Sequence, residues 1–162
     1  RLRINSRDAA AMVNLGRALL AQKRNEEARR RFQEAVQVDP KLDEAHYYLG
    51  ILHRLEGAMD DAEREFGLAI QSNPQHARAH GNLGMVQYGL GRYDEAAEHF
   101  NEAIRLNGTD ALAHGALGAI RLIQGRNGEA VQLLSRAAQL DPANGEVRKN
   151  LELARRRVTN RP

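Results

Sequence analysis

Apolar residues between positions 43 and 76 recur at steps of three and four residues, which is the spacing of one face of an α-helix. The first run is Ala45, Leu49, Leu52 and Leu55, and the second run is Ala62, Phe66, Ala69 and Ile70. Gly57 separates the runs, and glycine is favoured where a turn needs a backbone conformation that a Cβ atom disfavours. Pro74 follows the second run, and proline cannot continue a helix. The pattern therefore predicts two helices joined by a tight turn.

The same hairpin pattern returns at a fixed period of 34 residues. Each copy has a Leu-Gly pair, then an alanine, then Phe or Leu four positions later, then a second alanine. The predicted copies are 9–42, 43–76, 77–110 and 111–144. A hairpin of this size cannot bury its apolar stripe alone, so neighbouring hairpins must stack. The period therefore predicts an all-α solenoid and not a single globular core.

The order of these landmarks, ending on a proline, resembles the tetratricopeptide repeat family over residues 9–144. Gly108 replaces the proline in the third copy, and Leu134 replaces the aromatic residue in the fourth. The resemblance implies an α-α superhelix (solenoid) of four 34-residue helical hairpins, in which the first helix of each hairpin lines a concave wall.

The two ends of the chain extend this repeat array. Residues 145–158 are predicted to form a capping helix that is apolar on one side and charged on the other, followed by a tail at 159–162. Residues 1–8 are interpreted as the remnant of an upstream repeat or an N-terminal tail. Only three of the 24 basic residues are lysine, and this arginine bias suggests a piece of a larger bacterial protein.

Composition narrows the class of protein further. No apolar run approaches the roughly 20 residues that a membrane-spanning helix needs, and no signal peptide is recognised in this stretch. The absence of cysteine excludes disulfides and thiolate zinc sites. The compartment stays open between cytoplasm and periplasm.

Three histidines, His46, His80 and His114, stand one period apart. Zinc ligands must lie about 2.1 Å from one ion, whereas equivalent positions on packed helices lie roughly 8–10 Å apart. We therefore expect these side chains to pack in the fold, with no metal site. No phosphate-binding loop or nucleophile motif is present, so we expect no enzyme activity and no cofactor.

The helix period places aromatic, arginine and methionine side chains on the predicted concave wall, and these residue types are favoured at binding hot spots. Gly81 and Gly115 occupy matching places there and are expected to leave room for a ligand backbone. We therefore predict a non-catalytic protein–protein interaction scaffold that binds a peptide or partner segment in this concave groove. The predicted partner-binding residues are Asn14, Arg17, Tyr47, Tyr48, Ile51, Arg54, Arg78, Asn82, Met85 and Tyr88.

One known mode of partner binding is disfavoured. Family members that grip the C-terminal carboxylate of heat-shock chaperones use a clamp of Lys, Asn and Arg side chains. The corresponding places hold Val13, Arg17, Tyr48, Arg78 and Asn82, and only Arg78 keeps the charge expected at its place.

Other partner classes stay open as alternatives. Similar repeat regions suggest a polysaccharide-binding or export-associated role, with tyrosines stacking on sugars, or a docking arm of a larger glycosyltransferase. Nucleic acid is disfavoured, because 21 acidic residues are interspersed among the basic ones and the formal net charge is only +3. Exposed stacking faces at the terminal repeats could also promote self-association.

Overall fold

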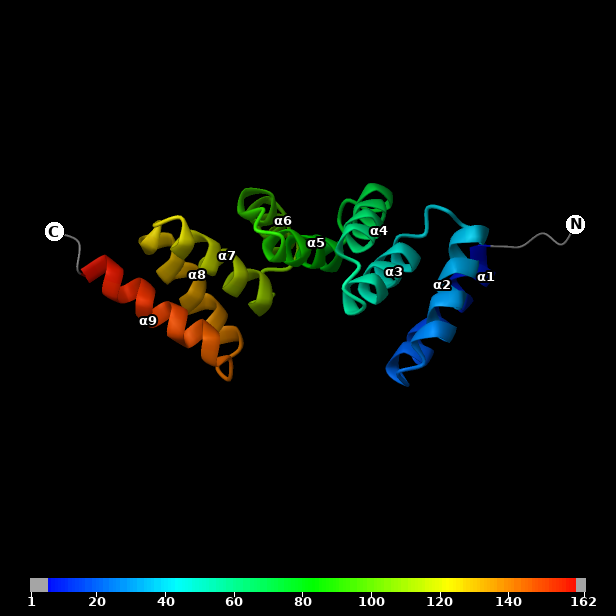
Figure 1. Ribbon diagram of the computed structural model, residues 1–162, viewed down its shortest axis with the longest axis horizontal. Helices are drawn as coiled ribbons and strands as arrows, with labels where there is room; N and C mark the ends of the chain where they lie inside the picture. The colour runs from blue at the N-terminus through cyan, green and yellow to red at the C-terminus, as the bar shows by residue number, and fades with distance from the viewer. Residues whose placement is uncertain (1–5, 160–162) are drawn as a thin grey trace, which may run out of the picture. The chain divides into compact units, whose positions relative to one another are not determined.

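The computed structural model describes residues 6–159, and side chains from residue 8 onward. This part of the chain contains nine α-helices and no strand (Figure 1). The all-α solenoid class predicted from the repeat is confirmed. The helices are α1 (Ser6–Ala21), α2 (Asn25–Val38), α3 (Asp43–Leu55), α4 (Met59–Ser72), α5 (Ala77–Gly89), α6 (Tyr93–Leu106), α7 (Ala111–Ile123), α8 (Asn127–Leu140) and α9 (Gly145–Thr159).

The turns inside the hairpins recur with the same period as the helices. Gly57, Gly91 and Gly125 have φ angles of 78°, 76° and 73°, in the left-handed region that glycine enters without a Cβ penalty. Lys23 takes the equivalent place in the first hairpin with φ 61°. The positive φ angle therefore belongs to this position of the repeat, and three of the four residues found there are glycine.

The described chain forms two compact units, one ending at Val86 and the other beginning at Gln87. In unit 1, the second helix of each hairpin places a fully buried phenylalanine against a glycine of the first helix. A Cβ atom added to Gly16 would lie 2.5 Å from the Phe32 ring, and one added to Gly50 would lie 2.7 Å from the Phe66 ring. The small residue is therefore required for the two helices to approach this closely.

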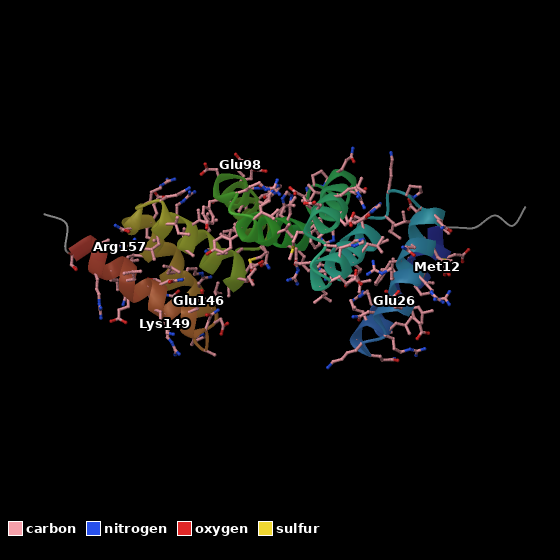
Figure 2. All side chains as sticks on the ribbon, in the orientation of Figure 1. Met12, Glu26, Glu98, Glu146, Lys149 and Arg157 are labelled. Atoms are coloured by element: carbon pink, nitrogen blue, oxygen red, sulfur yellow. The ribbon has the colours of Figure 1, made fainter. Side chains whose placement is uncertain are left out.

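Unit 2 repeats this contact with Leu134 in place of the ring. A Cβ atom on Gly118 would lie 2.7 Å from Leu134 Cγ. Glu152 of α9 stands one period after Gly118 and is exposed. Figure 2 labels Glu146, Lys149 and Arg157 along this helix, whose buried residues are Val147, Leu151 and Ala154.

The histidines one period apart are buried and have a local structural role. The Nε2 atoms of His46, His80 and His114 lie 3.0, 3.1 and 3.2 Å from the backbone carbonyl oxygen six residues earlier in the chain. Arg148 continues the series, because its Nη1 donates to the Pro142 carbonyl at 3.1 Å. Each side chain thus ties the start of a first helix to the loop before it. Among residues 6–159, no group of three His, Asp or Glu side chains is arranged to hold a metal ion.

His46 also makes a contact that shifts its pKa. Its Nδ1 lies 2.8 Å from Glu65 Oε2 on α4, and both side chains are largely buried. This hydrogen bond raises the pKa of His46 against the opposing effect of burial, with smaller contributions from the Pro40 carbonyl and the Asp43 charge. The protonated ring is therefore favoured in the folded state.

We expect the Glu65→Gln variant to lose a pH-dependent part of its stability. Because the folded pKa of His46 is raised, the stabilisation is fully present below the unfolded pKa of about 6.5 and is lost as pH rises through the folded value. The variant should be less stable than the parent by about 1 kcal/mol at pH 6, and the difference should shrink toward pH 8. Urea denaturation at both pH values measures it. The other titrating groups are the same in both proteins, so their effects cancel. A stability difference that stays constant between pH 6 and pH 8 would contradict the assignment to His46.

Candidate functional site

Two adjacent tyrosines of α3 form the aromatic base of a cluster in unit 1. Tyr48 stacks on Phe32, with ring centroids 5.1 Å apart and planes 10° from parallel. Tyr47 meets Tyr48 edge to face at 5.0 Å and lies 6.0 Å from Phe66. Both tyrosines are less than a tenth exposed, so the rings act mainly as a supporting surface. Burial raises the pKa of Tyr47.

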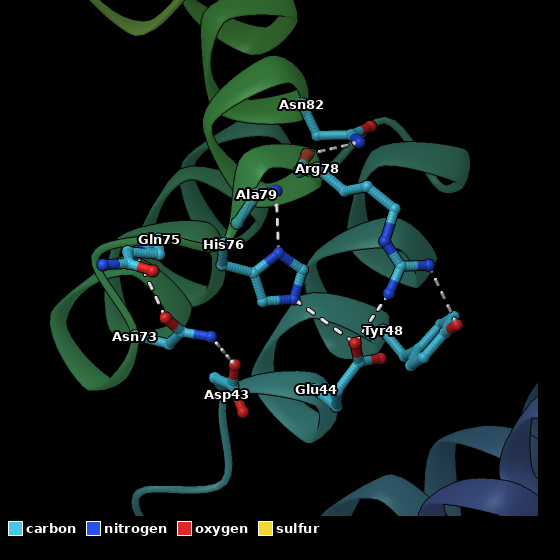
Figure 3. A network of polar contacts seen from close by, with 9 residues as sticks. All are labelled: Asp43, Glu44, Tyr48, Asn73, Gln75, His76, Arg78, Ala79 and Asn82. Carbon is cyan, nitrogen blue, oxygen red and sulfur yellow. Dashed lines mark hydrogen bonds and ion pairs between the residues drawn. The ribbon is translucent and has the colours of Figure 1, made fainter. Parts of the chain in front are cut away.

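Arg78, near the start of α5, lies against this aromatic base, and Figure 3 shows its contacts with Tyr48 and Glu44. Its guanidinium carbon is 4.7 Å from the centroid of the Tyr47 ring. Its Nη2 donates to Glu44 Oε1 at 2.6 Å, and its Nη1 donates to the Tyr48 hydroxyl at 3.5 Å. The side chain remains half exposed. Arg78 is therefore held in one orientation by three contacts while it still faces solvent.

Arg17 of α1 approaches the same tyrosine from another helix. Its guanidinium carbon lies 5.8 Å from the Tyr48 ring centroid, a distance at which a cation is attracted to the face of the ring. Arg17 is exposed. Tyr48 thus contacts two guanidinium groups, one at its ring and one at its hydroxyl. Together, Arg17, Glu44, Tyr47, Tyr48 and Arg78 are called the unit 1 cluster below.

His76 closes the cluster on its buried side. Its ring lies 4.9 Å from that of Tyr47, and its Nε2 is 3.7 Å from Glu44 Oε1. The Ala79 backbone N–H donates to His76 Nδ1 at 3.2 Å. Burial lowers the pKa of His76 more than the nearby Glu44 charge raises it. A neutral ring is therefore favoured, and the Glu44 carboxylate is left to pair with Arg78.

The predicted partner-binding residues fall into different environments. Asn14 is exposed, and Asn82 donates from its side chain to the Arg78 carbonyl at 2.9 Å. Three others are partly buried, namely Ile51, Arg54 and Met85. Tyr88 lies in unit 2, where it is partly buried 5.5 Å from the Tyr93 ring. The structure thus brings Arg17, Tyr47, Tyr48 and Arg78 into direct contact, with Asn82 bonded beside them.

The expectation for Gly115 was wrong. It is buried, and an added Cβ atom would lie 3.1 Å from Val147 of α9. The missing side chain therefore lets α9 pack closely, and it leaves no room for a ligand backbone.

Sequence reasoning missed the part played by His76, which has no spacing in common with the other histidines. The Glu44–Arg78 pair did have a signal. These two residues stand 34 positions apart and so occupy the same place in consecutive repeats. Opposite charges at equivalent positions of neighbouring repeats are brought side by side by the stacking, and that rule could have predicted the pair.

A family model described as Tetratricopeptide repeat matches residues 2–41, 13–77, 60–111 and 82–145. No curated protein sequence matches significantly. None of the described helices is long and apolar enough to cross a membrane.

Several solved structures share the fold at low sequence identity. YrrB, described as a TPR protein with an unusual peptide-binding site, has a TM-score of 0.82 at 22% identity, over 97% of this chain and 81% of that one. PilF of Pseudomonas aeruginosa has a TM-score of 0.81 at 22% identity, over 94% of this chain and 70% of its own. MamA has a TM-score of 0.79 at 19% identity, over 94% and 83%. At these identities the likeness concerns the fold alone.

Proposed function

Because this chain belongs to the tetratricopeptide repeat family, we propose that it is a non-catalytic scaffold that binds a peptide or partner segment at the unit 1 cluster. The fold is one that serves protein–protein interaction, and one protein of the same fold, YrrB, is described as having a peptide-binding site. The proposed place of binding is argued from the contacts within the unit 1 cluster.

The observation that carries the proposal is the pair of arginines supported on tyrosine rings. Both side chains are exposed: Arg78 is held over the Tyr47 ring and bonded to Glu44 and Tyr48, and the Arg17 guanidinium lies 5.8 Å from the Tyr48 ring centroid. Among the described residues no carboxylate lies within ion-pair distance of Arg17. Side chains that are already ordered lose less freedom when a partner arrives, so their contacts contribute more to affinity. Planar guanidinium groups also suit carbonyl and carboxylate oxygens of a peptide.

Three polar side-chain atoms in this part of unit 1 have no hydrogen-bond partner within the described chain. They are Glu44 Oε2, His76 Nε2 and, farther along α3, Arg54 Nε, and all three are shielded from solvent. A buried polar atom without a partner costs about 1–3 kcal/mol. A peptide backbone offers both donors and acceptors for such atoms, whereas a purely apolar ligand offers neither. This requirement favours a peptide over a purely apolar ligand.

We expect Arg17→Ala and Arg78→Ala each to weaken binding of peptides selected on the wild-type chain from a random display library. The expected loss is about tenfold or more, the size typical of an interface hot spot. Fluorescence anisotropy measures the affinities. Arg30→Ala is the matched control, because Arg30 is an exposed arginine of α2 outside the cluster. Equal affinity of all three variants for every selected peptide would refute the proposed site.

Two other classes of partner are proposed as alternatives. The first is polysaccharide binding, either in an export-associated region or in a docking arm of a larger glycosyltransferase. In that role the tyrosines would stack on sugar rings. The burial of Tyr47 and Tyr48 weighs against it, and a glycan array that shows no binding would dismiss it.

Self-association of the chain is favoured by one exposed face of α1. Leu15 is 49% exposed, whereas Leu49, Leu83 and Leu117 at the same repeat position are nearly fully buried. The α1 face could therefore accept a helix from a second copy. A constant sedimentation coefficient over a wide range of protein concentration would count against this role.

A further inference from the structure

The residue directly before each of the helices α5, α7 and α9 caps that helix with its side chain. These three residues stand 34 positions apart, at the same place of consecutive repeats. A side chain at this place accepts a hydrogen bond from a backbone N–H that the start of the helix leaves free. The three bonds run from the Ala79 N–H to His76 Nδ1, from the Ala113 N–H to Asp110 Oδ1 and from the Val147 N–H to Asn144 Oδ1, over 3.2, 2.9 and 3.1 Å.

Histidine differs from the other two capping residues because it titrates near neutral pH. An Asn side chain takes up no proton in the physiological range and Asp takes one up only at about pH 4, whereas imidazole takes one up at about pH 6.5. Because His76 Nδ1 accepts from Ala79, the neutral ring carries its hydrogen on Nε2, and a further proton must go to Nδ1.

Protonation of His76 would therefore remove the side-chain cap of α5. A protonated Nδ1 is a donor only, so it cannot accept from the Ala79 N–H. That N–H keeps only its second acceptor, the His76 carbonyl oxygen at 3.0 Å. The charged ring would also stand at the N-terminus of the helix, where the helix dipole disfavours a positive charge.

The other ring nitrogen faces the carboxylate that holds Arg78 (Figure 3). His76 Nε2 lies 3.7 Å from Glu44 Oε1, which is too far for a hydrogen bond, and it makes no hydrogen bond within the described chain. The same Oε1 accepts from Arg78 Nη2 at 2.6 Å. A charged His76 would therefore compete with Arg78 for one carboxylate oxygen.

The surroundings of His76 keep the ring neutral until the solution is acidic. Burial lowers the pKa of His76, and Arg78 on the same helix lowers it further. The carboxylates of Glu44 and Asp43 on α3 act in the opposite direction but are outweighed. The Tyr47 ring, 4.9 Å away, stays uncharged because its own pKa is raised. At neutral pH the cap of α5 and the Glu44–Arg78 pair are therefore both in place.

We propose that His76 is a positioning residue for Arg78 that makes partner binding at the unit 1 cluster sensitive to acid. The neutral ring caps the helix that carries Arg78 and leaves Glu44 Oε1 to the guanidinium. The charged ring does neither, so Arg78 loses its fixed orientation and the partner is released. The loss of binding rests on the proposed function, whereas the change at His76 can be measured without any partner.

The matched variant for the test is His76→Asn, because Asn144 already caps α9 at the same place of the repeat. The variant retains an acceptor for the Ala79 N–H and takes up no proton between pH 8 and pH 5. His53→Asn is the control for removal of a histidine, since His53 lies on α3 outside the unit 1 cluster. Circular dichroism at both pH values checks that each protein remains folded.

The first measurement uses the whole chain, labelled with ¹⁵N, and no partner. We expect the ¹⁵N chemical shift of His76 Nδ1 to show an unprotonated nitrogen at pH 8 and a protonated one at pH 5. The Ala79 amide signal should move with the same midpoint. The Ala113 and Val147 amides should not, because their caps take up no proton in this range. An Nδ1 already protonated at pH 8, or a ring still neutral at pH 5, would overturn the inference.

The second measurement is peptide affinity at pH 8 and pH 5. The probes are peptides without histidine, selected at pH 8 on the wild-type chain from a random display library and weakened by Arg78→Ala. The ratio of the two affinities is compared between proteins, so any loss common to both pH values cancels. We expect the parent and His53→Asn to bind about tenfold more weakly at pH 5, and His76→Asn to change less than about threefold.

The two measurements separate the inference from the proposed function. An equal pH ratio in the parent and in His76→Asn, or tighter binding of the parent at pH 5, would overturn the role of His76 and leave the unit 1 cluster as a binding site. A selection that yields no peptide weakened by Arg78→Ala would remove the proposed function and with it the loss of binding. The chemical shifts would still decide whether protonation of His76 removes the cap of α5.

Discussion

Replacing Phe66 with alanine is expected to destabilise the folded chain by about 3–5 kcal/mol, the range for removal of a fully buried aromatic side chain. The Phe66 side chain has no exposed surface and fills the space above Gly50. Its ring also lies 6.0 Å from that of Tyr47, so the loss should loosen the aromatic base of the unit 1 cluster. Urea denaturation followed by circular dichroism measures the change.

The matched control for this substitution is Phe66→Leu. Leucine already occupies the equivalent place in the fourth repeat, where Leu134 is fully buried against Gly118. The leucine variant should therefore lose clearly less stability than the alanine variant, because a branched aliphatic side chain fills most of the same space. Equal losses for the two variants would show that the ring itself, and not the filled volume, stabilises the hairpin.

Replacing Gly50 with alanine should destabilise the protein by about 1–3 kcal/mol, although alanine is the better helix former by about 1 kcal/mol. The added methyl group would lie 2.7 Å from the Phe66 ring, so α3 and α4 would have to move apart. The measurement is again the free energy of unfolding in urea.

Gly67→Ala is the opposite case and the control for the glycine prediction. Gly67 lies within α4 and nothing stands within 4 Å of the place where its Cβ atom would be. The substitution should stabilise the protein by about 0.5–1 kcal/mol, since only the backbone preference changes. A destabilised Gly67→Ala, or a stabilised Gly50→Ala, would contradict the packing described for unit 1.

The contact between glycine and aromatic residue explains why the fold was so well predicted from the sequence. The Leu-Gly pair and the phenylalanine stand at a fixed separation in the first three copies, and the structure places Gly16 on Phe32 and Gly50 on Phe66. The turn at Gly57 also has the positive φ angle that a glycine between two helices suggested. These features depend on helix geometry and on residue size, both of which a linear spacing records.

The candidate site was predictable only in part, for a physical reason that Tyr48 and Arg78 illustrate. The helix period placed Tyr48 and Arg78 on the predicted concave face of the first helices. It could not show that Tyr48 would be buried while the two arginines that contact it stayed exposed. That outcome depends on which long side chains meet across neighbouring helices. The contact of Gly115 with Val147 is a second case, because it arises from the packing of α9 on α7.

The sequence by itself determined the repeat length, the helix pairs, the turn positions and the small-to-large contacts within each hairpin, because all of these are set by residues of one copy. Only the tertiary structure decided which polar groups pair between copies, as Glu44 does with Arg78, and where apolar side chains stay uncovered, as Ile123 and Leu153 do beside Arg157. The reason is that these features follow from distances between helices, and those distances are fixed when the hairpins pack on one another.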